Sequence, residues 1–285
     1  MATMRQIRSR IRVAKNIQQI TKAMKLVAAA RLRRAQDAVV SARPYAQSIR
    51  DVIQSVAGAA GDVRHPLLRR TEGEAKNVGV LLITGDRGLC GSYNTNAIRR
   101  ASELASALEP DRVRFICVGQ RGARFFRNRG YNVVADFGIQ TTGTTFVRAQ
   151  EVAAAASKLF QSEEVDALHL VYTRFISAMT QHAENVQLFP LDPQSDGANS
   201  PNIEFEPSAE GILEGLLPRY IDTLVYQAMV ESRASFFGSQ MTSMSSATDN
   251  AGKMISTLTL SLNRARQATI TREISEIVGG AEALK

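Results

Sequence analysis

The chain of 285 residues lacks tryptophan, and aromatic residues make up only 6% of it. Its two cysteines, Cys90 and Cys117, lie in apolar or glycine-rich surroundings, which favours two reduced thiols over a disulfide. No apolar run approaches the roughly 20 residues that a helix needs to cross a bilayer, and no signal peptide is visible. Alanine, serine and threonine are plentiful, which suits thin helices that approach each other closely.

Proline is absent before Pro44 and after Pro218, and the other six prolines lie between residues 66 and 207. Because a proline inside a helix costs about 3 kcal/mol or more, this distribution permits a long helix at each end of the chain. The turns are concentrated in the middle. At 1.5 Å per residue, a helix from Arg219 to the end would be about 100 Å long. Such a helix needs a partner along its length.

Both terminal segments have a heptad pattern. In residues 3–58 the spacing 4-3-4-3 predicts a seam made of Val13, Ile17, Ile20, Met24 and Val27. In residues 208–283 the corresponding seam is Met241, Met244, Thr248, Ala251, Ile255, Leu258, Leu262 and Ala265. We predict that the two helices form a long antiparallel coiled coil. The C-terminal helix is the longer, so its tip around Glu276–Leu284 should be a single helix.

The middle of the chain changes its period. Short apolar runs predict strands at 78–83, 113–118, 131–137 and 165–172, with an edge strand at 185–189. Helical stretches intervene near 94–107, 119–129 and 144–161. This alternation is typical of a mainly parallel sheet with helices on its faces. We therefore predict an α/β fold in which a Rossmann-like domain (76–190) is inserted between coiled-coil segments 1–58 and 208–285.

The net charge of +8 is unevenly distributed, because residues 1–36 contain ten Lys or Arg and no acid before Asp37. A basic helix of this kind has four interpretations: a presequence, a nucleic-acid-binding helix, a solvated face, or a helix that faces an acidic protein ring. A presequence needs no heptad seam, and no aromatic residue is interleaved before Tyr45 to favour nucleic acid. The acidic ring also explains why the helix is half of a rod.

The glycine-rich turn Thr84–Gly91 follows the first predicted strand. Such turns often bind phosphate, but this one lacks the Lys-Ser/Thr ending of a P-loop and the glycine spacing of a dinucleotide site. A tight structural turn or an exposed contact site are the alternatives. His65, His169 and His182 are isolated, and no spacing pairs Cys90 with a histidine. We expect no catalytic, cofactor or metal site.

Three motifs carry a family resemblance. Asn16–Ala30 (NIQQITKAMKLVAAA) resembles the N-terminal signature of ATP synthase γ subunits. Gly85–Gly91 resembles their central Asp-Arg-Gly-Leu-Cys-Gly motif, with Gly85 where many members have Ser. Asn263–Ala281 resembles their C-terminal signature. The three matches lie in the expected order and span nearly the whole chain, so the sequence is similar to bacterial F-type γ subunits.

The resemblance implies a rotor without a catalytic site of its own. In this family the coiled coil stands inside a ring of α and β subunits, and its lower part sits with the ε subunit on the membrane-embedded c-ring. Proton flow turns the c-ring and the γ subunit, which drives the catalytic β subunits through ATP synthesis. The implied location is peripheral, on the cytoplasmic face of the bacterial inner membrane, with membrane contact only through the c-ring and with no nucleic acid or cofactor.

The resemblance also implies contact residues. Lys22, Met24 and Lys25 match residues that face an acidic lever of a β subunit. Arg266 and Gln267 match a pair that hydrogen-bonds a β-subunit loop, and Arg87 and Cys90 match residues near the lower β surface. Met24 also belongs to the predicted seam, so a purely structural role for its side chain remains open.

Overall fold

The computed structural model describes residues 3–60, 67, 75–138, 146–190 and 209–282. The chain forms two compact units: a helical unit of residues 1–28 and 241–285, and a sheet unit of residues 29–240. None of the helices among the described residues has a stretch long and apolar enough to span a membrane.

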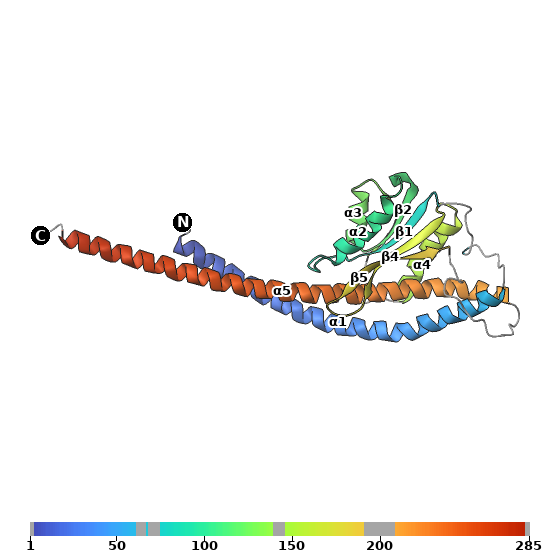
Figure 1. The fold of residues 1–285 in the computed structure, drawn as a ribbon, viewed down its shortest axis with the longest axis horizontal. Coiled ribbons are helices and arrows are strands. Elements are labelled where there is room, and N and C mark those ends of the chain that lie inside the picture. Colours follow the sequence, from blue (N-terminus) through green and yellow to red (C-terminus); the bar gives the residue numbers. More distant parts are fainter. Residues whose placement is uncertain (1–2, 61–66, 68–74, 139–145, 191–208, 283–285) are drawn as a thin grey trace. The chain divides into compact units, whose positions relative to one another are not determined.

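Two helices occupy the ends of the chain, as predicted. Helix α1 covers Met4–Ala60 and helix α5 covers Ala209–Glu282, and each contributes residues to both units (Figure 1). Both helices continue through a proline, Pro44 in α1 and Pro218 in α5. Both prolines are exposed, so the backbone hydrogen bond that each one removes lies on the solvent side, where it costs least.

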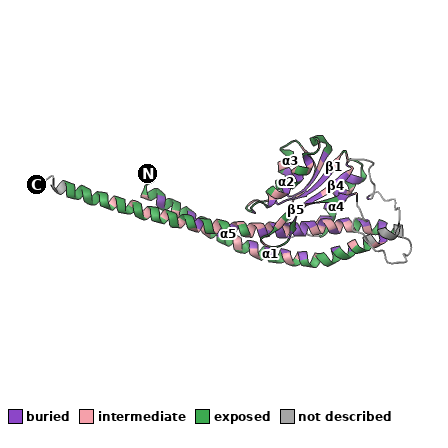
Figure 2. Ribbon diagram, viewed as in Figure 1, coloured by how far each residue is buried: buried purple, intermediate pink, exposed green. Residues whose placement is uncertain are grey.

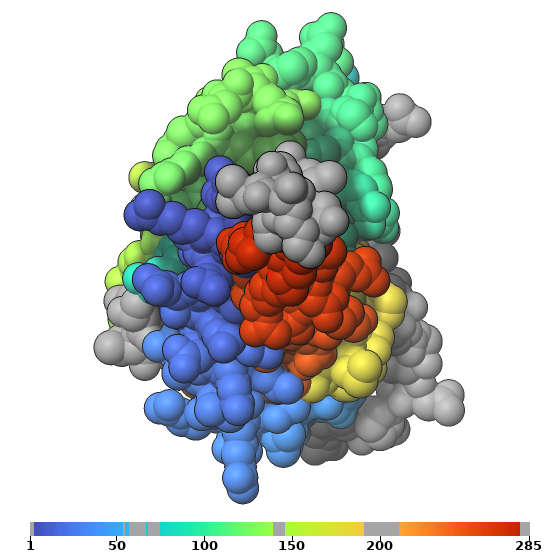
Figure 3. Space-filling view, turned by 90° about the vertical axis from the view of Figure 1, so that its left-hand side faces the viewer, coloured from blue at the N-terminus to red at the C-terminus, as the bar shows by residue number. Residues whose placement is uncertain are grey.

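Within the helical unit the two helices run antiparallel. Lys25 Nζ donates a hydrogen bond to Ser245 Oγ at 3.0 Å, and Thr248 Oγ1 donates one to Thr21 Oγ1 at 2.8 Å. A Cβ added to Gly252 would lie 3.1 Å from the side-chain nitrogen Nε2 of Gln18. As the numbers fall along α1 they rise along α5, which is the signature of an antiparallel pair. Figure 3 shows the N-terminal part of α1 (blue) next to the C-terminal part of α5 (red), and Figure 1 shows α5 continuing past the start of α1.

The predicted seam of the N-terminal helix is wrong by one residue. Val13, Ile17, Ile20 and Val27 are each about half exposed, whereas Ala14, Thr21 and Ala28 are buried. One row of α1 residues with 4-3 spacing is buried or partly buried throughout: Ile7, Ile11, Ala14, Gln18, Thr21, Lys25, Ala28, Leu32, Ala35, Val39, Ala42, Ala46, Ile49, Ile53 and Val56. The reason is steric: small side chains let two helix backbones approach closely, so the large branched residues one position earlier face outward.

The predicted seam of the C-terminal helix is confirmed. Met244 and Ala251 are buried, and the other six predicted seam residues are partly shielded. From Thr271 to Gly279 every residue is exposed, which Figure 2 shows as a green end of α5. No described residue of the helical unit covers this stretch, as predicted for a single-helix tip. Leu284 lies outside the described residues.

The sheet unit contains five strands in the order β3-β2-β1-β4-β5. Strands β1 (Val78–Ile83), β2 (Val113–Val118), β3 (Asn132–Phe137) and β4 (Ala167–Phe175) are parallel, and β5 (Gln181–Phe189) pairs antiparallel with β4. The predicted mainly parallel sheet is confirmed. The hairpin strands β4 and β5 extend further toward each other than predicted, because a tight turn closed by Ser177 N and Thr180 O joins them.

Helices cover both faces of the sheet, as predicted. Helices α2 (Tyr93–Ala105) and α3 (Gln120–Arg127) pack on the face that contains Val80, Leu82, Phe115 and Cys117, and a short 3-10 helix (Pro110–Arg112) precedes β2. Helix α4 (Phe146–Gln161) packs on the opposite face. That second core also contains residues of both terminal helices: Ile49, Ile53 and Val56 of α1, and Leu213, Leu217, Ile221, Val225, Ala228 and Met229 of α5.

The terminal helices therefore complete the core of the sheet unit as well as forming a helix pair. The sheet unit extends from residue 29 to residue 240, well beyond the inserted segment of 76–190. The predicted boundaries of the two coiled-coil segments and the inserted domain, at residues 58, 76, 190 and 208, stay a prediction.

Substitutions on the two neighbouring faces of α1 distinguish the observed seam from the predicted one. Ala28→Leu places a large side chain at a fully buried position and should destabilise the chain by about 1–3 kcal/mol, as overpacking does. Val27→Ala, one residue earlier and half exposed, should change the free energy of unfolding by less than about 0.5 kcal/mol. Urea denaturation followed by circular dichroism measures both. If Val27→Ala destabilised the chain more than Ala28→Leu did, the predicted seam through Val27 would be right.

Candidate partner-contact surfaces

The first predicted contact group lies on α1 in the helical unit. Lys22 is exposed, and Met24 and Lys25 are half-buried. The ammonium of Lys25 donates to Ser245 Oγ, so this side chain is part of the helix pair and presents only part of its surface outward. Met24 lies one position before the seam residue Lys25, beside the interface rather than in it. Lys22 and the outer part of Met24 are thus the members of this group that a partner can reach.

The second predicted group lies further along α5 in the same unit. Arg266 and Gln267 are both exposed. Along α5 they lie about 30 Å beyond Ser245, the residue that Lys25 contacts, at 1.5 Å per residue. The structure therefore does not bring the two groups together. They are separate points on one helix pair.

The third predicted group lies in the sheet unit, in the turn between β1 and α2. The turn begins at Thr84, whose buried hydroxyl donates to the carbonyl of Gly119 at 3.2 Å and accepts from Gly122 N at 3.0 Å. Gly119 has φ +98, and a Cβ there would lie 2.2 Å from the carbonyl oxygen of Thr84. Only glycine allows the two loops to approach this closely.

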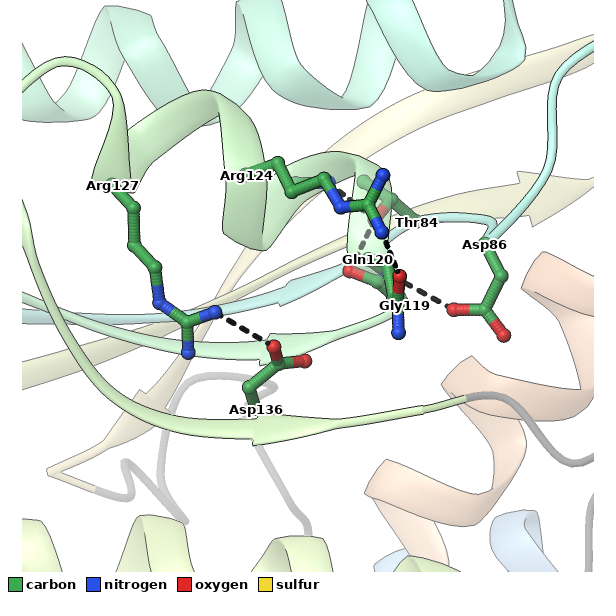
Figure 4. A network of polar contacts seen from close by, with 8 residues as sticks. Thr84, Asp86, Gly119, Gln120, Arg124, Arg127 and Asp136 are labelled. Atoms are coloured by element: carbon green, nitrogen blue, oxygen red, sulfur yellow. Dashed lines mark hydrogen bonds and ion pairs between the residues drawn. The ribbon is translucent and has the colours of Figure 1, made fainter.

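The carboxylate of Asp86 is used within the chain. Gln120 N donates to Asp86 Oδ1 at 2.9 Å, at the start of α3, and Arg124 donates to the side chain of Gln120 at 2.6 Å (Figure 4). A carboxylate at the N-terminus of a helix is stabilised by the helix dipole and by free backbone N–H groups. Asp86 thus gives this turn a structural use, because it links the turn to the start of α3. Beside it, Arg127 pairs with Asp136 at 3.0 Å.

The side chain of Cys90 belongs to the interior of the turn. It is 1% exposed, and its sulfur accepts a hydrogen bond from Asn94 Nδ2 at 3.3 Å. Asn94 also donates to the carbonyl of Arg87 at 3.1 Å and accepts from Gly85 N at 2.8 Å. Burial raises the pKa of the Cys90 thiol, which disfavours the nucleophilic thiolate. The thiol of Cys90 thus lies inside the turn and helps to hold its shape, and contact of this residue with a partner stays a prediction.

The exposed side chains of this turn are those of Arg87 and Leu89. Leu89 is 63% exposed and has a positive φ of 62, a conformation that is uncommon for leucine. The turn is tied to α5 of the same unit, because Ser239 Oγ donates to the carbonyl of Cys90 at 2.6 Å. The result is a firmly anchored loop with a cationic and an apolar side chain outward. Leu89 was missed in the sequence, because nothing in the local pattern separates it from Cys90, which lies between the same two glycines and is buried.

Comparison with known proteins decides the family. The family model for ATP synthase matches residues 3–284. The ATP synthase gamma chain of Heliobacterium modesticaldum is 48% identical over 293 aligned residues, with 100% of both chains covered. That of Desulforamulus reducens is 47% identical, again over the full length of both. The chain belongs to the ATP synthase gamma chain family.

Solved structures share the fold of this gamma-family chain. A chain from the Euglena gracilis mitochondrial ATP synthase has a TM-score of 0.73 at 20% identity, with 99% of this chain and 94% of that one covered. A chain from the central stalk and c-ring structure of the Tetrahymena thermophila mitochondrial ATP synthase has a TM-score of 0.62 at 23% identity, covering 80% of this chain and 99% of that one. At this level of identity the likeness concerns the fold alone.

The structure explains one departure from the family pattern. Gly85 stands where many gamma chains have Ser, and a Cβ at this position would lie 2.9 Å from Cε2 of Phe236. Phe236 lies on α5 and packs edge-on against Tyr93, with ring centroids 5.5 Å apart. No positive φ is needed at Gly85. The glycine is thus favoured by its close neighbours, above all the Phe236 ring and then Asn94 Oδ1 at 3.2 Å, and not by a positive φ.

A double-mutant cycle tests this coupling. Gly85→Ser should destabilise this chain by about 1–3 kcal/mol, because the new Cβ overlaps a packed ring. In a Phe236→Leu background the same substitution should cost at least about 0.5 kcal/mol less. Urea unfolding of the four proteins gives the coupling energy. Gly88→Ser is the matched control, because there the only near neighbour is the flexible end of Arg121. An equal cost of Gly85→Ser in both backgrounds would show that Phe236 is not the reason for the glycine.

Proposed function

We propose that this chain is the central-stalk rotor of a proton-translocating F-type ATP synthase and couples rotation of the c-ring to conformational change in the catalytic β subunits. It is a non-catalytic subunit. The observation that carries the proposal is the full-length match to gamma chains, together with the antiparallel helix pair to which both chain ends contribute.

The helix pair has the properties that transmission of torque requires. Two helices joined along a continuous seam resist twisting better than one. The small residues Ala14, Thr21 and Ala28 keep the pair thin, so it can turn inside a ring of subunits. Its basic outer positions attract acidic partners through exposed charges, which contribute only about 0–1 kcal/mol per pair. Contacts of this strength can be exchanged during rotation without a deep energy trap.

The partners follow from the proposal. We propose that the helical unit lies inside a ring of α and β subunits and that the chain also binds the ε subunit and the c-ring. The gamma-family structures from Euglena and Tetrahymena are named as parts of assemblies with a c-ring, which supports a membrane-bound complex. The chain would then be peripheral, on the cytoplasmic face of a bacterial inner membrane, and would reach the membrane only through the c-ring.

The β-subunit contacts are proposed at three places. Lys22 and Met24, with the outer part of Lys25, face an acidic lever. Arg266 and Gln267 bind a loop nearer the tip, where the planar guanidinium can form two charge-assisted hydrogen bonds with one carboxylate. Arg87 of the central turn contacts the lower β surface. Cys90 acts there only by shaping the turn.

Co-expression with the α, β and ε subunits of the same source tests the function. Native mass measurement should find one copy of this chain with three αβ pairs.

In the complete membrane-bound enzyme, Arg266→Ala should leave the mass unchanged but lower the ratio of protons pumped to ATP hydrolysed. The loss should be several-fold, because a charge-assisted hydrogen bond contributes about 1.5–3 kcal/mol. Arg264→Ala, another exposed arginine of the same helix, is the control.

The two outcomes that would contradict the account are separable. If no complex with α and β subunits forms, the rotor function is wrong. If the complex forms and both arginine variants pump alike, the rotor function stands and the contact assignment of Arg266 is wrong.

A further inference from the structure

A small cavity lies in the sheet unit, near the carboxyl end of β4. Its volume is about 220 Å³. Three parts of the chain form its walls: the start of α2, the end of β4 with the turn that leads into β5, and α5. Six of the residues that line it have uncharged polar side chains: Ser92, Asn96, Thr173, Thr180, Gln181 and Ser239. We call it the polar cavity.

The polar cavity lies where open α/β sheets bind their ligands. The strand order is β3-β2-β1-β4-β5, so the chain leaves β1 toward β2 on one side and later enters β4 on the other. In such sheets ligands bind outside the carboxyl ends of the two strands at which the order reverses, which here are β1 and β4. Ser92 and Asn96 follow β1, and Thr173 lies near the end of β4. The position of the cavity therefore suits a ligand.

One wall of the polar cavity contains a buried hydroxyl that the chain does not use. Thr173 is 3% exposed, and its Oγ1 has no hydrogen-bond partner among the described residues. Its backbone is held by α5: Thr173 N donates to Ser232 Oγ at 3.3 Å, and the carbonyl of Thr173 accepts from Ser235 Oγ at 3.1 Å. A buried hydroxyl without a partner costs free energy, and a molecule in the cavity that bonds to it would remove this cost.

The amide side chains of the polar cavity turn their oxygens toward a ligand. Gln181 Nε2 donates to the carbonyls of Ser177 at 3.1 Å and Ala178 at 2.9 Å, and Asn96 Nδ2 donates to Ser92 Oγ at 3.2 Å. From the described part of the chain, neither amide oxygen accepts a hydrogen bond. The cavity thus offers acceptors beside the hydroxyls of Ser92 and Thr173. Hydroxyl groups of a ligand fit this set, because each one can donate and accept.

Charge and size restrict the ligand further. No residue that lines the polar cavity is charged, so neither an anion nor a cation would find the opposite charge that its burial requires. A cavity of about 150 Å³ holds benzene, so the larger polar cavity has room for a molecule with a few more heavy atoms. We propose that the polar cavity binds a small neutral polyol. This inference concerns the isolated chain and does not depend on the rotor function.

Methyl NMR of the full-length chain with isotope-labelled methionines tests the proposal. Met179 lines the polar cavity, whereas Met254 is an exposed methionine of the helical unit and supplies the control signal. Erythritol should shift the Met179 signal and reach saturation at concentrations on the order of 10 mM, because so small a ligand makes few contacts. The Met254 signal should not move. Inorganic phosphate at the same concentration should shift neither signal.

Two equally buried threonines provide the matched variants. Thr173→Val should weaken erythritol binding about 3- to 10-fold, the effect of one lost hydrogen bond, and should leave the Tm unchanged or raise it. Thr223 is also 3% exposed, but it lies outside the polar cavity and its hydroxyl donates to the carbonyl of Arg219 at 2.8 Å. Thr223→Val should therefore lower the Tm and leave erythritol binding unchanged.

Several results would overturn the inference. Without a saturable shift of the Met179 signal, the polar cavity holds water only. A shift with phosphate and none with erythritol would make it an anion site. Equal affinity of the wild type and Thr173→Val, or a clear fall in the Tm of this variant, would show that the Thr173 hydroxyl serves the fold and not a ligand. None of these results bears on the rotor function, which assembly with α and β subunits tests.

Discussion

The structure depends on the close approach of two helix backbones along a seam of small residues. Ala14, Thr21 and Ala28 occupy successive heptad positions of α1, and the hydroxyl of Thr21 accepts a hydrogen bond from Thr248. Small side chains at the interface make the pair thin and fix its antiparallel register. They also leave the larger apolar and basic residues of α1 on the outside. The same packing choice thus determines both the stiffness of the rod and the chemistry of its surface.

The terminal helices serve the sheet unit as much as the helix pair. Residues 49–56 of α1 and 213–229 of α5 fill the core between the sheet and α4. The sheet unit therefore holds both helices through a packed interior. The turn Thr84–Gly91 lies in this unit and is tied to α5 by the hydrogen bond from Ser239 Oγ to the carbonyl of Cys90.

The sequence predicted the architecture well because helix, strand and turn signals were strong. Every strand and helix of the parallel sheet was found within a few residues. The register of α1 was missed because large apolar residues such as Ile17 and Ile20 dominate a hydrophobicity pattern, whereas close packing selects Ala14 and Thr21. The burial of Cys90 depends on contacts between distant segments, such as the hydrogen bond from Ser239 to the carbonyl of Cys90, which no local pattern records.

Disulfide formation in the isolated chain tests the central claim, the register of the helix pair. Thr21 Oγ1 and Thr248 Oγ1 lie 2.8 Å apart, so Thr21→Cys with Thr248→Cys should oxidise readily and shift the mobility on a non-reducing gel. Cys90 and Cys117 are buried and can remain. The account predicts a cross-link for this pair and none for Ile20→Cys with Thr248→Cys. Preferential cross-linking of the second pair would contradict the small-residue seam.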